Sequence, residues 1–266
     1  NSTNAFITYT RVQKKDYKIS GKVEKGPFIN GSSVSLEILD SKLNGSGKVY
    51  NSETTDNLGS FSFDCKEVSD TYAEIKANGY FFNEVKGTLS NGTLTLRALV
   101  DLRDNTTINV NVLTHLKYAR IKNLVASGKK FNEANKQAQK ELLNAFGLGK
   151  YNQKEVSSFS ITAGTDESAA LIAISSLLLL DRTEAEFTEY LSRLSADFGN
   201  NGKFSEEIEN QINSDKQELS EYLEDINTNI INRYSELGMQ VQVKDLSYFI
   251  DWNNDGTAGN EILKEG

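Results

Sequence analysis

The spacing of apolar residues changes once along this chain of 266 residues, near residue 105, and this change constrains the fold more than any other feature. Before it, apolar residues alternate with polar ones in short runs, which is typical of half-buried strands. After it, apolar residues recur at helical spacing, beginning with Val112, Leu113 and Leu116. The segment Thr107–Ala119 contains the change and is predicted to be a strand end that leads into a helix.

The region 17–104 is predicted to form an antiparallel β-sandwich. Its period-two runs include Val34, Leu36 and Ile38, and turn residues such as Asn30-Gly31 and Asn91-Gly92 separate the runs. Repeated short strands with Gly and Asn turns favour a small all-β unit.

The region 105–240 is predicted to form an all-α bundle. Asn111, Thr165 and Thr183 are expected N-cap residues, and Ser127-Gly128 is the expected turn between the first two helices. A second capping pattern, Ser214-x-x-Gln217, predicts a short helix followed by a long one near the end of the bundle.

These patterns predict an α+β multidomain chain, in which the β-sandwich and the bundle each bury a core. Residues 1–16 are polar and are interpreted as a tether, and residues 241–266 as a C-terminal extension with an acidic loop. The most apolar run, Ala169–Leu180, is too short for a membrane span and predicts a buried helix instead.

Two motifs of the N-terminal region resemble a known family. The run Ser20–Val34, with its G-x-V strand, and the hairpin Thr54–Phe63, with T-D-x-x-G-x-F, are similar to the carboxypeptidase regulatory-like (transthyretin-like) domain. This resemblance covers roughly the first hundred residues. It implies a seven-stranded sandwich with an accessory role and no catalytic residues.

The helical region carries a further resemblance, through Asn109–Arg120, Phe131–Glu141 and Ala196–Gly202. These segments resemble exported multidomain proteins of gut-type Gram-negative anaerobes, in which a regulatory-like sandwich precedes a helical segment opening with N-x-L-T-x-L. The resemblance implies an outer-surface lipoprotein or secreted protein of adhesive or uncharacterised role. It also leads us to expect a lipid anchor preceding residue 1 and further domains after Gly266.

The charge distribution argues against nucleic acid as a partner. The formal net charge is -8, and no basic face stands out in the sequence. A single cysteine excludes an internal disulfide, and with a single histidine it excludes a Cys/His zinc cluster.

The lone histidine and the lone cysteine are both interpreted as structural. His115 has no partner at a recognisable catalytic spacing, so we expect a polar residue at the junction of the two regions. Cys65 continues the strand pattern of Phe61 and Phe63, which predicts a buried side chain.

The acidic loop near the C-terminus is the candidate ion site. Oxygen-bearing side chains at loop positions 1, 3 and 5, followed by Gly256, match the first half of an EF-hand-type calcium loop. The second half departs from it, because the acid falls at position 11 instead of 12. An Asx/Gly turn without an ion is the alternative. The predicted calcium ligands are Asp251, Asn253, Asp255, Thr257 and Glu261.

Two functional hypotheses follow. The first is a non-enzymatic cell-surface or secreted module for adhesion, glycan contact or scaffolding, whose partner is a glycan or a surface protein. The second is an accessory or catalytic part of a polysaccharide-acting hydrolase. Tyr80, Phe81 and Phe82 are weighed as a sugar-stacking platform, although strand alternation favours the core for most of them.

Overall fold

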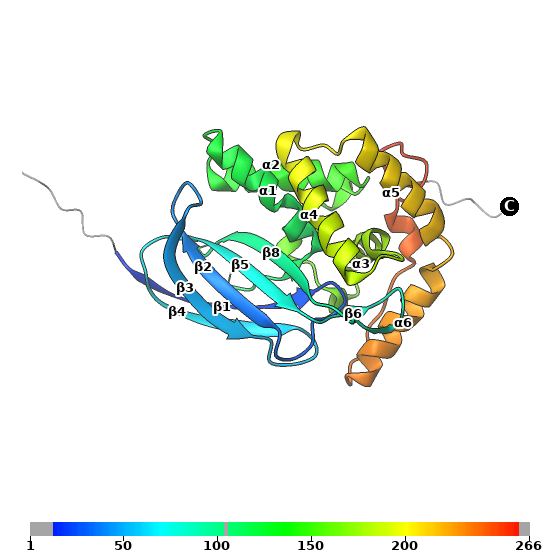
Figure 1. Cartoon of the computed structure of the whole chain (residues 1–266), viewed down its shortest axis with the longest axis horizontal. Coiled ribbons are helices and arrows are strands. Elements are labelled where there is room, and N and C mark those ends of the chain that lie inside the picture. The colour runs from blue at the N-terminus through cyan, green and yellow to red at the C-terminus, as the bar shows by residue number, and fades with distance from the viewer. Residues whose placement is uncertain (1–12, 104–105, 261–266) are drawn as a thin grey trace, which may run out of the picture.

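The strands of the N-terminal region form two sheets and a short hairpin in the computed structural model, which describes residues 13–103 and 106–260 (Figure 1). The first sheet has the order β4-β1-β9 and the second β3-β2-β5-β8, while β6 pairs with β7. The strands are β1 Lys15–Glu24, β2 Ser33–Leu39, β3 Gly45–Glu53, β4 Ser60–Val68, β5 Tyr72–Gly79, β6 Phe82–Asn83, β7 Thr88–Leu89, β8 Leu94–Asp101 and β9 Val110–Asn111.

Alternation decides which side of each strand is buried. In β2, Val34, Leu36 and Ile38 are buried, and in β4 Phe61 and Phe63 are buried while their neighbours face solvent. Side chains of both sheets belong to one buried cluster. This arrangement is consistent with the predicted β-sandwich and gives the chain a mixed α+β fold.

The first sheet extends past the predicted boundary at residue 104. Strand β9 pairs in parallel with the end of β1, through Val23 with Val110 and Glu24 with Asn111. Helix α1 then begins at the next residue, Val112. A strand of the sheet and the first helix are therefore one continuous segment.

Helical spacing and caps explain most helix boundaries. The side chain of Asn111 accepts the N–H of Thr114, and Thr165 and Thr183 cap the following helices in the same way, as predicted. Every residue from Ser168 to Leu179 is buried, so α3 is the central helix of the bundle. The helices are α1 Val112–Ala126, α2 Phe131–Ala145, α3 Asp166–Leu179, α4 Glu184–Asn201, α5 Glu206–Leu219 and α6 Leu223–Glu236.

The prediction of a helix start at Ser214 is wrong. Helix α5 continues through this exposed residue to Leu219, and α6 begins only at Leu223. Two buried side chains hold α5 to its surroundings beside Ser214: Asp215 accepts a hydrogen bond from Arg182 (2.7 Å), and Lys216 donates to the carbonyl of Asp251 (2.6 Å). These tertiary contacts outweigh the local capping preference.

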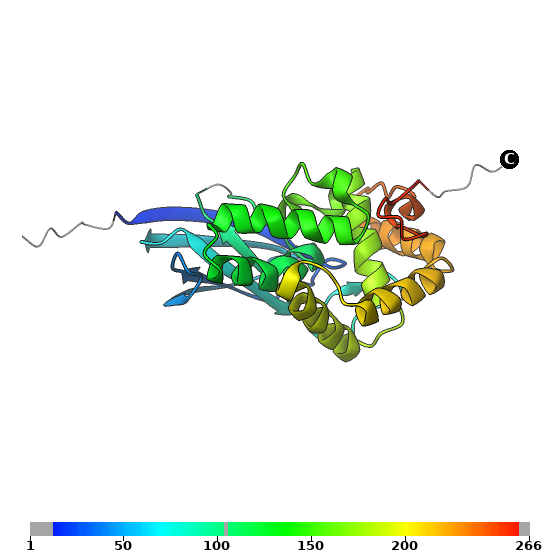
Figure 2. The same cartoon turned by 90° about the horizontal axis from the view of Figure 1, so that it is seen from above.

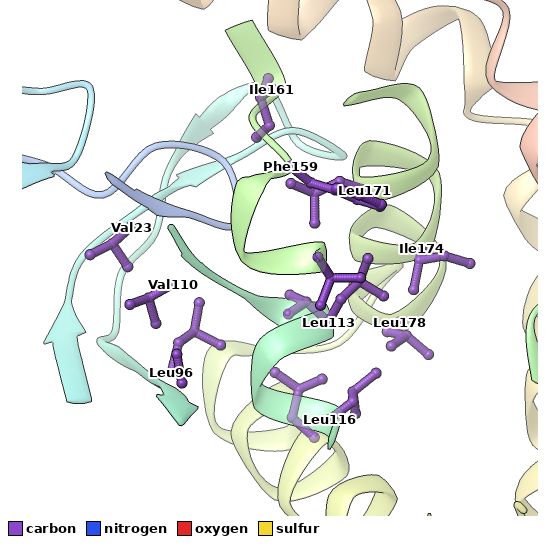
Figure 3. Packing of buried hydrophobic residues seen from close by; sticks show 14 of the residues in the cluster. Val23, Leu96, Val110, Leu113, Leu116, Phe159, Ile161, Leu171, Ile174 and Leu178 are labelled. Carbon is purple, nitrogen blue, oxygen red and sulfur yellow. The ribbon is translucent and has the colours of Figure 1, made fainter. Parts of the chain in front are cut away.

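Sheets and helices share one hydrophobic cluster. Figure 3 shows Val23, Leu96 and Val110 of the sheets on one side and Leu113 and Leu116 of α1 beside Phe159 and the α3 residues Leu171, Ile174 and Leu178. Figure 2 shows the green helices α1 and α2 along the sheets, and the yellow-orange α5 and the orange α6 beyond the end of the sheets. The packing therefore continues from the sheets into the helices without a solvent layer between them. A separate, smaller cluster lies between the sheets and the α1–α2 hairpin.

Within residues 13–103 and 106–260, no helix has both the length and the apolar character that a bilayer crossing requires.

Candidate functional site

The acidic loop is folded around the carboxylate of Asp251. This residue follows a short 3-10 helix, Leu246–Phe249, and is only 6% exposed. Its two oxygens accept the backbone N–H groups of Asp255 (3.1 Å) and Gly256 (2.9 Å). The first predicted ligand therefore already shapes the loop.

Asp255 and Asn253 complete the turn. The Asp255 carboxylate accepts the side-chain amide of Asn260 (2.7 Å) and the N–H of Thr257 (2.9 Å), while Asn253 Oδ1 accepts the N–H of Asp255 (2.9 Å). The contact with Asn260 is the largest cause that lowers the pKa of Asp255. Asp255 thus carries a negative charge at neutral pH.

The loop is anchored to two helices that are distant in sequence. The Lys216 ammonium group on α5 donates to the carbonyl of Asp251 and to Oδ1 of Asn254, both at 2.6 Å. After the end of α2, the carbonyl of Gly147 accepts the N–H of Ala258 (2.9 Å). No local sequence pattern indicates these anchors, because they lie far from the loop along the chain.

The donor atoms of the loop are oxygens, which hard cations such as calcium prefer. Asp251, Asn253 and Asp255 offer carboxylate and amide oxygens, and these side chains already accept hydrogen bonds within the loop. Thr257 would contribute its carbonyl, and the fifth predicted ligand, Glu261, lies outside the described residues. Among residues 13–103 and 106–260 no group of three or more acidic, His or Cys side chains is arranged to hold a metal ion. Calcium at this loop stays a prediction.

His115 is a buried residue of α1. Its side chain lies in the first turns of α1, and its Nδ1 has no hydrogen-bond partner among the described residues. Burial, with a smaller contribution from the charge of Arg97, lowers the pKa of His115 to about 4. The imidazole is therefore neutral at physiological pH, and it lacks the partner that would orient a general base.

Cys65 and the aromatic triplet lie mostly inside the sheets. Cys65 is fully buried, and burial raises its thiol pKa to about 11, so the reactive thiolate is scarce. Phe81 and Phe82 are core residues and only Tyr80 is exposed, so these three side chains do not form a platform.

The acidic pair Asp181 and Glu218 was not among the predicted site residues. Asp181 and Glu218 line a groove of about 450 Å³ next to α4 and α5, and the hydrogen bond between their carboxyl groups raises the pKa of Glu218. The two residues lie 37 positions apart (218 − 181), and nothing in their local sequence distinguishes them from other solvated acids.

Comparison of the chain with models of known protein families gave no match, and comparison with curated proteins gave none either. The resemblance to the carboxypeptidase regulatory-like family rests on its sequence motifs.

Proposed function

We propose that this chain is a non-enzymatic module of a cell-surface or secreted protein that serves adhesion, glycan contact or scaffolding. The observation that carries the proposal is the joint between sheets and helices. Asn109 accepts the N–H of Lys22 (3.0 Å) and donates its amide to the carbonyl of Phe159 (3.0 Å), while Asn111 donates to the carbonyl of Val156 (2.8 Å). A joint with buried hydrogen bonds and a shared core holds both parts in a fixed relation, which suits a positioning role.

The state of the two most reactive residue types supports this proposal. His115 is neutral and packed, and Cys65 is buried with a raised pKa. Both side chains contribute to packing in their regions.

We propose calcium as a stabilising ion of the acidic loop. Because Lys216 and Gly147 attach the loop to α5 and to the end of α2, an ion bound by Asp251, Asn253 and Asp255 would fasten the C-terminal extension to the bundle. The ion would supply structural stability and no catalytic chemistry.

We infer a carboxypeptidase regulatory-like sandwich over 17–104 and a helical bundle over 105–240, acting as one accessory unit. The outer-surface location follows from the family resemblance and is proposed with it.

A polysaccharide-acting hydrolase is the second candidate, and the Asp181–Glu218 pair favours it, since a carboxyl group with a raised pKa is suited to act as a general acid. Glycosidase carboxyl groups, however, stand about 5–9.5 Å apart, to leave room for substrate or water. Two carboxyl groups in direct hydrogen-bond contact are closer than that, and this difference places the hydrolase second.

A glycan array followed by product analysis tests the proposal. The chain is expected to bind a glycan or a protein of the cell surface, and to leave every bound polysaccharide intact. Release of reducing ends that is abolished by Glu218→Gln would overturn the non-enzymatic proposal and support the hydrolase.

A further inference from the structure

A wide groove lies between the sheets and the α1–α2 hairpin. Its volume is about 850 Å³, and its walls are the turn after β2, around Ser41 and Lys42, and the turn Gly128–Lys130 that precedes α2. Figure 1 shows these two turns on the same side of the molecule. A groove of this size is in the range of small-ligand sites and exceeds what a single inorganic anion fills.

The groove is basic in a chain that is acidic as a whole. Four cationic side chains line it, Lys42, Arg103, Lys129 and Lys130, against one carboxylate, that of Glu133. The net charge of the chain is -8. A local excess of positive charge in an acidic protein concentrates anions at that one place.

The three lysines differ from Arg103 in how they are held. Asp101 accepts hydrogen bonds from Nε (2.9 Å) and Nη2 (2.5 Å) of Arg103, which neutralises that guanidinium. Lys42, Lys129 and Lys130 are exposed; Lys42 interacts electrostatically with Asp40, and among the described residues no carboxylate lies within ion-pair distance of the three ammonium groups. Their ammonium groups are therefore available to a ligand.

The floor of the groove is fixed and partly apolar. The ring of Tyr72 lies 4.7 Å from that of Phe131 and 5.7 Å from the Arg103 guanidinium, measured to ring centroids. Beneath them lies the smaller hydrophobic cluster, which includes Leu43 and Val125. At the rim, Ser41 and Asn132 add a hydroxyl and an amide. A preformed floor with a polar rim binds a ligand without a large ordering cost.

We propose that this groove binds an acidic sugar residue of a polysaccharide. The carboxylate or sulfate of the sugar is held by Lys129 and Lys130, with Lys42 on the opposite wall, and its hydroxyls bond to Ser41 and Asn132. The inference rests on the proposed function, since it names the glycan class for a glycan-contacting module. A uronate and a sulfated sugar share this chemistry, and the test separates them.

Calorimetry with the full chain tests the inference, using tetragalacturonate, a sulfated chondroitin tetrasaccharide and neutral maltotetraose as probes. The double variant Lys129→Ala/Lys130→Ala removes two exposed charges without touching the core. The matched control is Lys140→Ala/Lys203→Ala, which removes two exposed lysines away from the groove. Thermal denaturation confirms that all the proteins are folded.

At least one acidic tetrasaccharide is expected to bind the wild type, and the double variant should weaken the Kd about 3- to 30-fold while the control leaves it unchanged. Maltotetraose should give no heat. If neither acidic probe gives heat at about 10 mM, a concentration at which even weak binding is detectable, the inference is overturned. Equal binding by an oligodeoxynucleotide of similar charge would overturn it too.

Glycan binding that survives Lys129→Ala/Lys130→Ala would refute the groove and leave the proposed function standing. Complete lack of glycan binding on the array, together with lack of binding to surface proteins, would instead refute the proposed function. The two failures are thus distinguishable.

Discussion

Lys25 and Glu84 form an ion pair that is excluded from water, with side chains 0% and 1% exposed. Lys25 directly follows β1 and Glu84 directly follows β6. The hydroxyl of Ser176 in the central helix α3 also donates to Glu84 (3.1 Å), and the rings of Phe81 and Phe187 lie near the ammonium group. Through Ser176 and Phe187 the pair therefore connects the sheet region to the helices.

Lys25→Met is expected to destabilise the protein by about 3–5 kcal/mol, because it leaves the Glu84 carboxylate buried without its counter-ion. Lys25→Met/Glu84→Leu should recover much of that loss. Urea denaturation measures both. Lys66→Ala, which removes exposed ion pairs with Asp16 and Asp64, is the control and should change stability far less, because solvent screens these pairs. Equal effects of Lys25→Met and the control would contradict this prediction.

The buried Glu24 side chain is expected to make the protein less stable as the pH rises. Burial raises its pKa from 4.5 to about 7, although the hydroxyl of Ser160 donates to one of its oxygens (3.0 Å). Between these values the folded state binds the proton and the unfolded state does not. The contribution of Glu24 to the free energy of unfolding is therefore complete below pH 4.5. It is lost as the pH rises through 7, by up to about 3 kcal/mol.

Glu24→Gln tests this relation, because the neutral amide cannot titrate. The difference in unfolding free energy between wild type and variant should shift in favour of the variant from pH 5 to pH 7.5. Parallel pH profiles of the two proteins would show that Glu24 is not the group responsible.

Burial of His115 is expected to give stability the opposite pH dependence. Its folded pKa of about 4 lies below the ordinary 6.5, so the unfolded state takes up the proton first and stability falls as the pH drops from 6.5 towards 4. His115→Ala should cost about 1–2 kcal/mol at pH 7.5 through lost packing, and less at pH 4.5. Glycan or surface-protein binding should persist; loss of binding with an unchanged melting temperature would refute the structural role.

Calcium binding is expected to depend on Asp255. Calorimetry should show heat from the wild type at millimolar calcium and none from Asp255→Asn or Asp251→Ala/Asp255→Ala, with a melting temperature raised by the ion only in the wild type. Asp225→Asn, at an exposed acid in α6, should bind as the wild type does. Absence of heat from the wild type would refute the prediction of a calcium site.

Gly147→Ala should release the acidic loop from α2. Gly147 has a φ of +70°, and an added Cβ would lie 2.7 Å from Cβ of Asp251 and 2.9 Å from the nitrogen of Ala258. We expect a loss of about 1–3 kcal/mol and faster hydrogen exchange at the Ala258 amide. Gly238→Ala is the control: its φ is similar, +77°, but no atom lies within 4 Å of the added Cβ, so only backbone strain remains.

Local signals predicted much of the fold. Asn111, Thr165 and Thr183 cap helices as expected, because a capping side chain bonds to a backbone group only three residues away. The end of α5 was missed because contacts of Asp215 and Lys216 with distant segments extend the helix through Ser214.

The sequence pattern predicts the candidate ligands of the site but not the contacts that hold the loop. Asp251 and Asp255 were identified from loop spacing, but their use as acceptors for the loop's own N–H groups depends on conformation. Lys216 is 35 residues from Asp251, and Glu84 is 59 residues from Lys25, so no local pattern could pair them. Lys25 precedes Gly26-Pro27, a sequence that usually marks an exposed turn.

The position of β1 in the middle of its sheet has a mechanical consequence. The strand runs along the long axis of the molecule and is flanked by β4 and β9, while the C-terminal loop lies at the other end of that axis (Figures 1 and 2). A pulling force between the two ends would act parallel to β1, so its hydrogen bonds would resist together in shear instead of opening one after another. Such a module would carry tension along its length without unfolding at its first strand.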